Sequence, residues 1–463
     1  MSDRRILCCM SMNLVEKYNV SVPRYTSYPP ANYFKEMDGA TYLRAVDASN
    51  QVGSRNLSFY LHMPFCKRLC HYCGCNSYMM RSDEVVQQYV EALHKEIDLV
   101  AAHLDKNRLI SQIHYGGGTP TSMPVSILRD LNEHIISLFP KMKDAEISIE
   151  CHPGYLSHED WEALTRSHFN RFSIGVQDFD EKVLTTVGRT SPAIPMKDIM
   201  AILRAAHVGV NMDFLYGLPF QTPTSFMNSI EKAIALRPDR LVTFSYGHVP
   251  WVFKRQLILE KYGLPDADSK QQMYRNAVSL LKEAGYKSIG LDHFVLPSDE
   301  LFFALENGQL HRNFQGYCTL RTTGQVYALG VTGISQLDSV YAQNTKDIEE
   351  YISEVKANRL PIRKGYSLND QERVVKTVID CLMCNYRVIW KLLADSLQMT
   401  VAELKSHLHY DESLFETMAK DGVILYNEEE LKVTEIGHPF VRNVAAVLDP
   451  LMQNTTKQFS KPI

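Results

Sequence analysis

The sequence of 463 residues contains no apolar run close to the roughly 18–20 residues that a bilayer-spanning helix needs. The apolar stretch 6–10, which follows Arg4 and Arg5, is too short for the core of a signal peptide. Low-complexity segments and repeats of solenoid length are also lacking. These absences predict a cytoplasmic protein with no membrane span and no repetitive architecture.

An excess of charge of one sign is lacking as well. The 49 Lys and Arg nearly balance the 53 Asp and Glu, for a formal net charge of −4. This balance gives no general affinity for phosphates, so we expect no nucleic-acid partner. The hydrophobic fraction of 45% is that of a globular chain, long enough for one large domain and one or two small ones.

Short β-rich runs alternate with amphipathic helical runs after an N-terminal arm, which favours βα units around a mostly parallel sheet or barrel. Apolar residues recur every three or four positions from Val86 to Leu104, which predicts a helix that Ser82 caps. The expected strands are 57–62, 109–115, 146–150, 171–176, 210–215, 241–246 and 287–291.

The alternation fades after residue 291, and a helical region opens near Leu368. Residues 423–426 and 431–434 read as a hairpin, so the chain is expected to end in a small helical domain with a wing. A wing can enter DNA, but Glu428, Glu429 and Glu430 at its tip would repel phosphate. We therefore favour a structural role for this hairpin.

Four of the ten cysteines lie between Cys66 and Cys75, directly after the first expected strand, where barrel folds gather catalytic groups. Three thiolates on one loop can ligate three irons of a [4Fe–4S] cluster and leave the fourth iron open. Four cysteines within ten residues also fit a structural zinc site, and a CxxC redox pair is a third interpretation. A zinc ribbon normally divides its ligands between two knuckles, so the cluster is favoured.

Glycine and polar residues follow the next expected strands. The run 116–120, Gly-Gly-Gly-Thr-Pro, allows the backbone to approach a ligand closely and exposes N–H donors. The alternative interpretation is a tight turn without a ligand. A Walker loop is excluded, because the run lacks the required Lys. Glu150, Gln177 and Asp213 end successive strands, whose carboxyl ends meet at one mouth. Arg189 can pair with a carboxylate there.

The spacing CxxxCxxC after the first strand of a βα barrel resembles the radical S-adenosylmethionine superfamily. The resemblance implies a partial (β/α)6 barrel in which Cys66, Cys70 and Cys73 hold a [4Fe–4S] cluster. It further implies that the open iron binds S-adenosylmethionine, which is split to a 5′-deoxyadenosyl radical. Cys75 is left outside the cluster.

The closer resemblance is to the oxygen-independent coproporphyrinogen III oxidase (dehydrogenase) family. It rests on five stretches: 23–29 (Pro-Arg-Tyr-Thr-Ser-Tyr-Pro), 60–76, 114–121, 173–179 and 311–317. It implies an oxidoreductase of haem biosynthesis that converts two propionates of coproporphyrinogen III to vinyl groups, giving protoporphyrinogen IX. The haem-chaperone branch usually lacks the arm, the pair Cys75-Asn76 and the 313–317 stretch, so a haem-binding chaperone is a weaker alternative. A radical haem-modifying enzyme, which shares the cluster and part of the scaffold, is a second weaker alternative.

Carried over residue by residue, the resemblance implies S-adenosylmethionine contacts at Tyr60, Tyr72, Gly117, Gly118, Thr119, Glu150, Gln177, Arg189, Asp213, Gly247 and Ile334. Phe314 and Gln315 match positions near a second S-adenosylmethionine, and two molecules are expected per product. At Tyr72 and Gly247 the family also uses Phe and Ala. Residues 318–327 differ from the enterobacterial pattern.

Candidates for catalysis and substrate binding come from the same motifs. Tyr60 and His62 alternate along the first strand, so both are expected to face the barrel interior. Cys75 is a candidate for proton or electron handling, with a spectator thiol as the equal alternative. Arg24 and Arg312 are the candidate cations for the carboxylates of the substrate.

The resemblance also divides the chain. We expect an N-terminal arm (1–50), a radical S-adenosylmethionine core (51–300), an extension that completes the active site (301–365) and a C-terminal helical domain with a wing-like hairpin (366–463). The implied partners are coproporphyrinogen III and a reducing electron donor such as flavodoxin or ferredoxin. The protein is expected to be a monomer.

Overall fold

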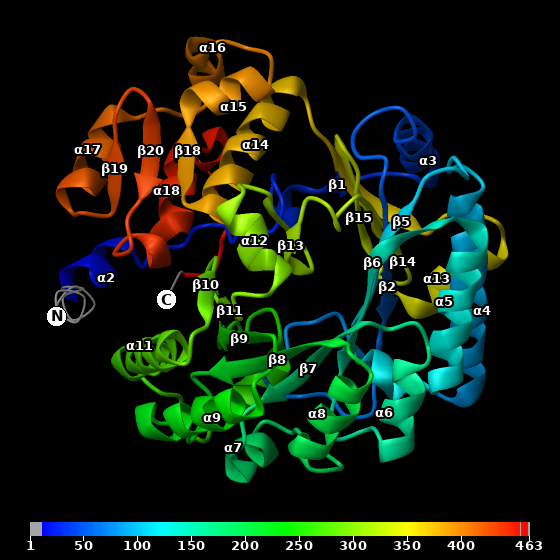
Figure 1. Ribbon diagram of the computed structural model, residues 1–463. Helices are drawn as coiled ribbons and strands as arrows, with labels where there is room; N and C mark the ends of the chain where they lie inside the picture. The colour runs from blue at the N-terminus through cyan, green and yellow to red at the C-terminus, as the bar shows by residue number, and fades with distance from the viewer. Residues whose placement is uncertain (1–11, 454, 462–463) are drawn as a thin grey trace.

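The computed structural model describes residues 12–453 and 455–461, so Cys8 and Cys9 lie outside the described residues. It is dominated by one sheet of strand order β1-β17-β16-β15-β14-β2-β5-β6-β7-β8-β9-β11-β10 (Figure 1). Its seven central strands, β14 to β9 in that order, are all parallel. This is the curved βα sheet that the sequence predicts.

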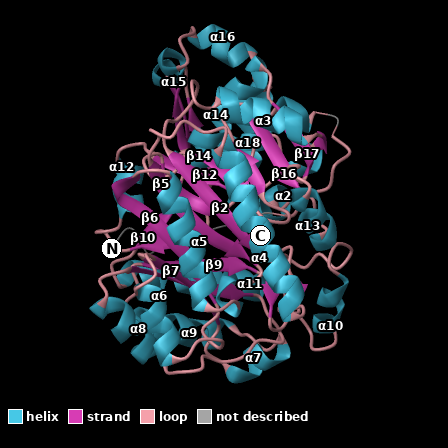
Figure 2. Cartoon of the chain, turned by 90° about the vertical axis from the view of Figure 1, so that its right-hand side faces the viewer, coloured by secondary structure: helices cyan, strands magenta, loops and turns pink. Residues whose placement is uncertain are grey.

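The first six expected strands are confirmed, with ends that differ by at most five residues. They are β2 (Leu57–Met63), β5 (Ile110–Gly117), β6 (Lys141–Cys151), β7 (Arg171–Gln177), β8 (Gly209–Tyr216) and β9 (Arg240–Ser245). The helices that follow them are α4 (Asp83–Ala101), α5 (Val125–Leu138), α6 (His158–Thr165), α7 (Glu181–Thr186), α8 (Met196–Ala205), α9 (Pro223–Leu236), α10 (Leu257–Glu260) and α11 (Ala267–Glu283). Figure 2 shows α4 and α5 in front of the strands that they cover.

The expected helix after the first strand is α4, which buries Tyr89, Leu93 and Ile97 against the sheet. Ser82 occupies its N-cap position, but the Ser82 side chain makes no capping hydrogen bond. The prediction of a side-chain cap is therefore wrong. Asp83 and Glu84 in the first turn favour the helix start through the helix dipole instead.

The seventh expected strand is present but does not start a further βα unit. β10 (Lys287–Ile289) forms an antiparallel hairpin with β11 (His293–Val295), which pairs antiparallel with β9. Gly290 in the turn has a φ of 58°, which glycine adopts without strain. A connection this short can join only antiparallel strands.

The sheet continues beyond the point where the alternation in the sequence fades. β14 (Gln325–Leu329) pairs parallel to β2, and β15 (Ile334–Gln336), β16 (Val340–Asn344), β17 (Ile362–Ser367) and β1 (Lys35–Glu36) extend it antiparallel. α3 (Gly39–Ala48), α12 (Glu300–Glu306) and α13 (Ile348–Lys356) accompany this part, with a separate hairpin of β12 (Leu310–Asn313) and β13 (Gly316–Thr319). Residues of the 301–365 extension thus share the sheet of the core.

The C-terminal region contains α14 (Asp370–Asn385), α15 (Trp390–Ser396), α16 (Val401–Ser406), α17 (Glu412–Lys420) and α18 (Val441–Leu448). The expected hairpin is confirmed as β19 (Ile424–Tyr426) and β20 (Glu430–Val433), and β18 (Arg387–Ile389) adds a third strand. Tyr18 of α2 (Met12–Tyr18), Tyr25 and Tyr28 pack into the core of this region. The N-terminal arm is therefore anchored to the opposite end of the chain.

Two shorter strands, β3 (Phe65–Cys66) and β4 (Tyr78–Met79), form a parallel pair around the cysteine loop. In the part of the chain that the structure describes, no helix is both long and apolar enough to cross a membrane.

Candidate active site

The cysteine loop leaves the end of β2 at the carboxyl edge of the sheet. Cys66 and Cys70 are buried, Cys73 is half-buried, and all three thiols are free. The pairing of β3 with β4 closes the loop, because it holds both of its ends together. Cys75 is exposed at the surface of the loop.

Each of the three predicted cluster ligands has a polar group beside its sulfur. Thr119 Oγ1 lies 3.3 Å from Cys66 Sγ, Arg189 Nη1 donates to Cys70 Sγ at 3.7 Å, and the backbone N–H of Cys75 donates to Cys73 Sγ at 3.4 Å. A hydrogen bond from the Cys75 side chain, aided by nearby arginines, lowers the pKa of Cys73 to about 6. Such donors stabilise thiolates, the form of cysteine that binds metal.

These thiols fit an iron–sulfur cluster better than one zinc ion. Three free thiols lie on one loop, and a [4Fe–4S] cluster accepts each thiolate on a different iron, whereas a structural zinc ion takes four ligands at one centre. The donor set of three thiolates on one loop therefore fits the cluster.

The glycine run at the end of β5 is packed against the cysteine loop. A Cβ at Gly118 would lie 2.4 Å from the Pro64 oxygen, and one at Gly117 would lie 2.8 Å from the His62 ring. The N–H groups of Gly118 and Thr119 donate to the carbonyls of Met63 and Phe65. These two donors, which the sequence suggested were exposed for a ligand, instead fix the start of the cysteine loop.

The polar residues expected at the strand ends do meet at one edge of the sheet. Glu150 of β6 accepts from His114 Nε2 at 3.3 Å, and Gln177 ends β7 with a φ of 70°. Asp213 of β8 accepts hydrogen bonds from Ser173 and Asn211, yet burial raises its pKa to about 6.

Arg189 joins this edge to the cysteine loop. Its guanidinium donates to the carbonyl of Gly175 on β7, and Nη1 lies 3.4 Å from the hydroxyl of Tyr72 as well as 3.7 Å from Cys70 Sγ. No carboxylate pairs with it among the described side chains. Pairing of Arg189 with a carboxylate ligand stays a prediction.

Tyr60 and His62 face the same side of β2, as expected. The Tyr60 hydroxyl lies 3.1 Å from His62 Nδ1, and His62 Nε2 lies 2.9 Å from the Asn76 carbonyl oxygen. Burial lowers the pKa of His62, so the ring is neutral at pH 7. The two residues line a cavity of about 200 Å³ together with Glu150, Asn76, Asn313, Phe314, Gln315, Val326, Thr332, Ile334 and Gln336.

This small cavity brings together predicted residues that are far apart in the sequence. Glu150 comes from the core, while Phe314, Gln315 and Ile334 come from the 301–365 extension. Both polar atoms of the Gln315 side chain are buried without a hydrogen-bond partner in the described structure. Buried polar atoms are normally paired, so the cavity is suited to a polar ligand.

Some residues of the site carry no signal in the sequence. Arg255 donates to the carbonyl of Cys73 at 2.7 Å, and Gln256 donates to that of Tyr72 at 2.9 Å, both from a short 3-10 helix (Lys254–Gln256) after β9. Thr332 contacts His62 Nε2 at 3.3 Å from a turn with a φ of 64°. Their roles depend on contacts that the fold makes, and no local motif marks them.

The two candidate substrate cations differ in the structure. Arg312 is buried, and its Nη1 donates to the backbone carbonyl of Arg24 at 2.6 Å, so its guanidinium holds the arm in place. The Arg24 side chain is half exposed and lies 3.5 Å from Asp292. Arg24 and Gly247 line a second cavity, of about 650 Å³.

Comparison with known proteins places this geometry in a family. Residues 60–233 match the model of the Radical SAM superfamily. An oxygen-independent coproporphyrinogen III oxidase of Synechocystis sp. is 36% identical over 458 residues, which cover 98% of both chains. One from Escherichia coli is 36% identical over 457 residues, 97% of this chain and 98% of its own.

The fold agrees with the sequence match. The solved structure of coproporphyrinogen III oxidase from Escherichia coli, described as a radical SAM enzyme, superposes with a TM-score of 0.86 at 34% identity. The superposition covers 92% of this chain and 97% of that one. The chain thus belongs to the oxygen-independent coproporphyrinogen III oxidase family, within the radical S-adenosylmethionine superfamily.

Proposed function

We propose that this chain catalyses the oxygen-independent oxidative decarboxylation of two propionates of coproporphyrinogen III to vinyl groups, giving protoporphyrinogen IX. The observation that carries the proposal is the meeting of the three cysteines, the glycine run and Glu150 at one edge of the sheet, beside the Tyr60–His62 cavity. Relatives named for this activity match the chain over nearly its whole length.

Cys66, Cys70 and Cys73 would hold the [4Fe–4S] cluster, since the three thiols lie on one loop and each has a hydrogen-bonding neighbour. Bound together, the cluster and S-adenosylmethionine supply a 5′-deoxyadenosyl radical as the agent that removes hydrogen from the propionate β-carbon. The protein supplies position and excludes water.

The residues at the edge of the sheet would bind S-adenosylmethionine. Arg189 would pair with the ligand carboxylate, and the acidic side chains of Glu150 and Asp213 would accept its hydrogen-bond donors. The remaining proposed contacts are Tyr60, Tyr72, Gly117, Gly118, Thr119, Gln177, Gly247 and Ile334. Neutral His62 holds the Tyr60 hydroxyl and the Asn76 carbonyl and so keeps the wall of the small cavity in place.

Two S-adenosylmethionine molecules per product are part of the proposal. Two propionates react, and each would consume one molecule. The unpaired amide of Gln315 and the ring of Phe314, both lining the small cavity, are the groups that would contact part of the second molecule.

The partners follow from the chemistry. A reducing donor of the flavodoxin or ferredoxin type would deliver one electron for the cleavage of each S-adenosylmethionine, in a cytoplasmic setting where thiols stay reduced. A separate electron acceptor would take the one electron that each substrate radical releases as CO2 leaves and the vinyl group forms. The chain would act as a monomer, with the arm, the core, the extension and the C-terminal domain contributing to a single site. Cys75 is exposed next to Cys73 and is proposed to handle protons or electrons there.

The experiment is an anaerobic turnover assay. Reconstituted protein is incubated with reductant, S-adenosylmethionine and coproporphyrinogen III, beside a Cys66→Ser, Cys70→Ser, Cys73→Ser variant. Vinyl product and 5′-deoxyadenosine from the wild type alone are expected. Stoichiometric haem binding without turnover would indicate a carrier, and purified protein with zinc but no iron or sulfide would overturn the proposal.

A further inference from the structure

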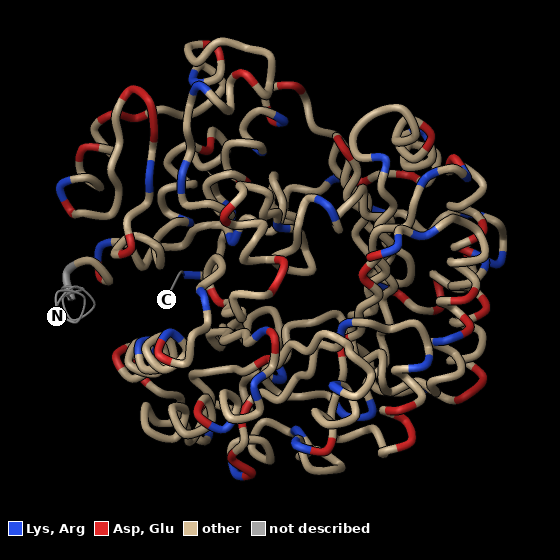
Figure 3. Tube along the Cα trace, viewed as in Figure 1, with Lys and Arg blue, Asp and Glu red and all other residues tan. Residues whose placement is uncertain are grey.

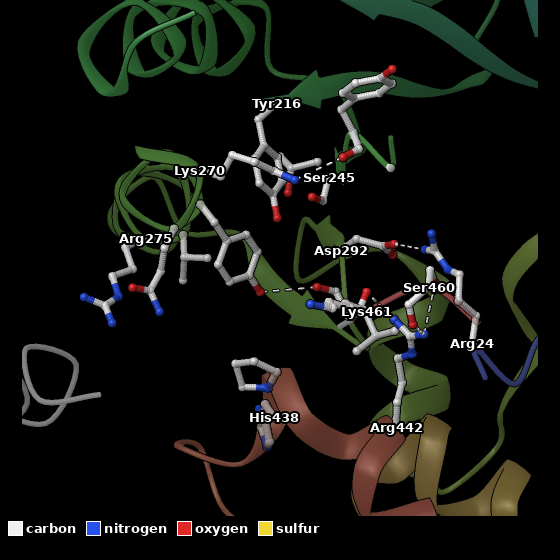
Figure 4. A pocket seen from close by; sticks show the side chains of 18 of the residues that line it. Arg24, Tyr216, Ser245, Lys270, Arg275, Asp292, His438, Arg442, Ser460 and Lys461 are labelled. Atoms are coloured by element: carbon white, nitrogen blue, oxygen red, sulfur yellow. Dashed lines mark hydrogen bonds and ion pairs between the residues drawn. The ribbon is translucent and has the colours of Figure 1, made fainter. Parts of the chain in front are cut away.

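A cavity of about 650 Å³ lies between the sheet edge, the N-terminal arm and the C-terminal domain. Its walls come from the ends of β8 and β9, from α11, from the turn before β11, from the arm and from α18. Figure 4 shows Lys270 and Tyr216 on one side, with Arg24 and Arg442 across from them. The tail residues Ser460 and Lys461 complete the wall.

The size of this cavity sets it apart from the small one. Pockets that bury ligands of drug size run from roughly 300 to 1,000 Å³. The cavity of about 650 Å³ is within that range, and the cavity of about 200 Å³ at Tyr60 and His62 is not. A tetrapyrrole macrocycle therefore requires the larger space.

Hydrogen bonds connect the wall of the large cavity to the cysteine loop. Gly247 lines it, and the side chain of Gln256 donates both to the Gly247 carbonyl at 3.4 Å and to the Tyr72 carbonyl at 2.9 Å. Tyr72 lies between two of the cluster ligands in the sequence. On the opposite side of the large cavity, Arg312 donates a hydrogen bond to the backbone carbonyl of Arg24. Residues 313–315, which follow Arg312 in the sequence, line the small cavity.

The charges around the large cavity are unbalanced. Six cationic residues line it against two carboxylates: Arg24, Lys270, Arg275, Lys282, Arg442 and Lys461, with Asp292 and Glu435. Of these cations, Arg24 alone forms an ion pair among the described side chains. Elsewhere both signs of charge are interspersed along the chain, as Figure 3 shows. The excess points to a ligand with several negative groups.

Two of the cations are partly desolvated without a carboxylate partner. Lys270 Nζ donates to the Tyr246 carbonyl at 3.0 Å, and burial lowers its pKa. Arg442 donates to the backbone of Pro23, Ser460 and Lys461, so it ties the arm to the tail. Burial, together with the nearby positive charges of Arg24 and Arg312, lowers the pKa of Arg442 to about 9.

We propose that the large cavity holds the tetracarboxylate macrocycle, and that Lys270 from α11 and Arg24 from the arm bind carboxylates that do not react. Arg442 keeps the arm and tail closed over the ligand. This inference rests on the proposed function and names the site where its substrate binds. It follows that affinity depends on the ligand carboxylates and on these two side chains.

The test is equilibrium binding of coproporphyrin III, the fluorescent oxidised analogue with the same four carboxylates, to the cluster-loaded protein. Lys270→Met and Arg24→Gln are each expected to weaken binding by about tenfold or more, since a hydrogen-bonded ion pair is lost. Lys270→Arg should restore most of the affinity. Lys197→Met, on the exposed face of α8, is the matched control and should bind like the wild type.

The tetramethyl ester of coproporphyrin III provides the second arm. It lacks negative charge, so the wild type, Lys270→Met and Arg24→Gln should bind it with equal affinity. Iron content and circular dichroism of each variant check that the fold is intact. Unchanged binding of the free acid by both variants, or an equal loss for acid and ester, would overturn the inference.

Failure of the inference can be told apart from failure of the proposed function. Wild-type protein that produces vinyl product while both variants bind coproporphyrin III normally would remove the cavity assignment and leave the enzyme assignment intact. Wild-type protein that makes no vinyl product, yet binds the acid through Lys270 and Arg24, would remove the enzyme assignment and support the cavity as a tetracarboxylate site.

Discussion

At the scale of single residues, the site depends on which atoms surround each sulfur. Cys66 and Cys70 are buried beside Thr119 and Arg189, while Cys75 is exposed. The CxxxCxxC spacing in the sequence sets the first three cysteines apart from Cys75. The structure makes the same distinction, because the first three thiols are buried or half-buried and Cys75 is exposed. Each of the three is therefore expected to be required for the cluster, and Cys75 is not.

Single substitutions test this division. Cys66→Ser, Cys70→Ser and Cys73→Ser should each reduce bound iron to a small fraction of the wild-type value, because serine supplies no soft thiolate for iron. Cys75→Ser is the matched control and should keep its iron. The measurement is iron and sulfide per chain after anaerobic reconstitution. Loss of iron from Cys75→Ser alone would reverse the assignment of the ligands.

Gly118 is a residue at which even one methyl group has a structural consequence. A Cβ there would lie 2.4 Å from the Pro64 oxygen, so Gly118→Ala must displace the backbone that leads into the cysteine loop. We expect a loss of about 1–3 kcal/mol of stability from this overpacking, and poor cluster retention.

Thermal unfolding of the apo protein and iron content measure these two effects. Gly74→Ala, within the cysteine loop itself, is the control, since its Cβ would meet Phe253 at 3.4 Å, an ordinary contact. An equal effect of both substitutions would show that the close approach at Gly118 is unimportant.

At the scale of helices and strands, α4 holds the turn that follows β14. Buried Glu96 accepts hydrogen bonds from the Gly330 N–H at 2.7 Å, from Asn344 at 2.7 Å and from the Tyr351 hydroxyl at 2.6 Å. The turn leads to Thr332 and Ile334, which line the small cavity. Glu96 is thus a positioning residue for one wall of the site.

The stability of this element is expected to depend on pH. Burial raises the pKa of Glu96 from 4.5 to about 6, so the folded protein binds this proton more tightly than the unfolded chain does. The contribution of Glu96 to the free energy of unfolding is therefore fully present below pH 4.5 and is lost as the pH rises through 6. At 1.36 kcal/mol for each pKa unit, the loss is about 2 kcal/mol.

Melting temperatures between pH 4.5 and pH 7 test this expectation. The wild type should lose stability relative to Glu96→Gln as the pH rises, because glutamine does not ionise. Glu91→Gln, exposed on the same helix, is the control for the loss of a carboxylate from α4. A constant difference for Glu96→Gln would contradict the account.

Local sequence patterns predicted a large part of this architecture but not its long-range contacts. The pattern of β-rich and amphipathic runs predicted six parallel strands and α4, and the cysteine and glycine motifs predicted where the site lies. The pairing of β14 with β2 joins residues such as Val326 and Ser58, and the contact of Arg312 with Arg24 spans 288 positions. The periodicity of apolar residues does not indicate contacts between residues so far apart in the sequence. The extension of the sheet and the role of Arg312 are therefore seen only in the structure.

At the scale of the whole molecule, the two ends of the chain meet. Tyr25 and Tyr28 of the arm donate hydrogen bonds to Asp449, at 2.9 Å and 3.0 Å. Arg442 adds bonds to the backbone of the arm and of the tail. The C-terminal domain thus holds the arm across the large cavity, although hundreds of residues separate the two.

Removal of the Arg442 guanidinium should release this closure. Arg442→Gln would leave buried carbonyls of the arm and tail unpaired, and we expect cleavage of the arm by a protease to become about tenfold faster or more. Limited proteolysis of the folded protein measures the rate. Arg373→Gln, half exposed in the same domain, is the control. Equal cleavage rates in wild type and Arg442→Gln would show that other contacts hold the arm.

The most direct test of the account follows a single hydrogen atom. Coproporphyrinogen III deuterated at the propionate β-carbons is supplied to the reduced, cluster-loaded protein with S-adenosylmethionine in the absence of oxygen. We predict that deuterium appears in 5′-deoxyadenosine, two molecules of which form for each divinyl product. Vinyl product accompanied by unlabelled 5′-deoxyadenosine, or no cleavage of S-adenosylmethionine at all, would contradict the account.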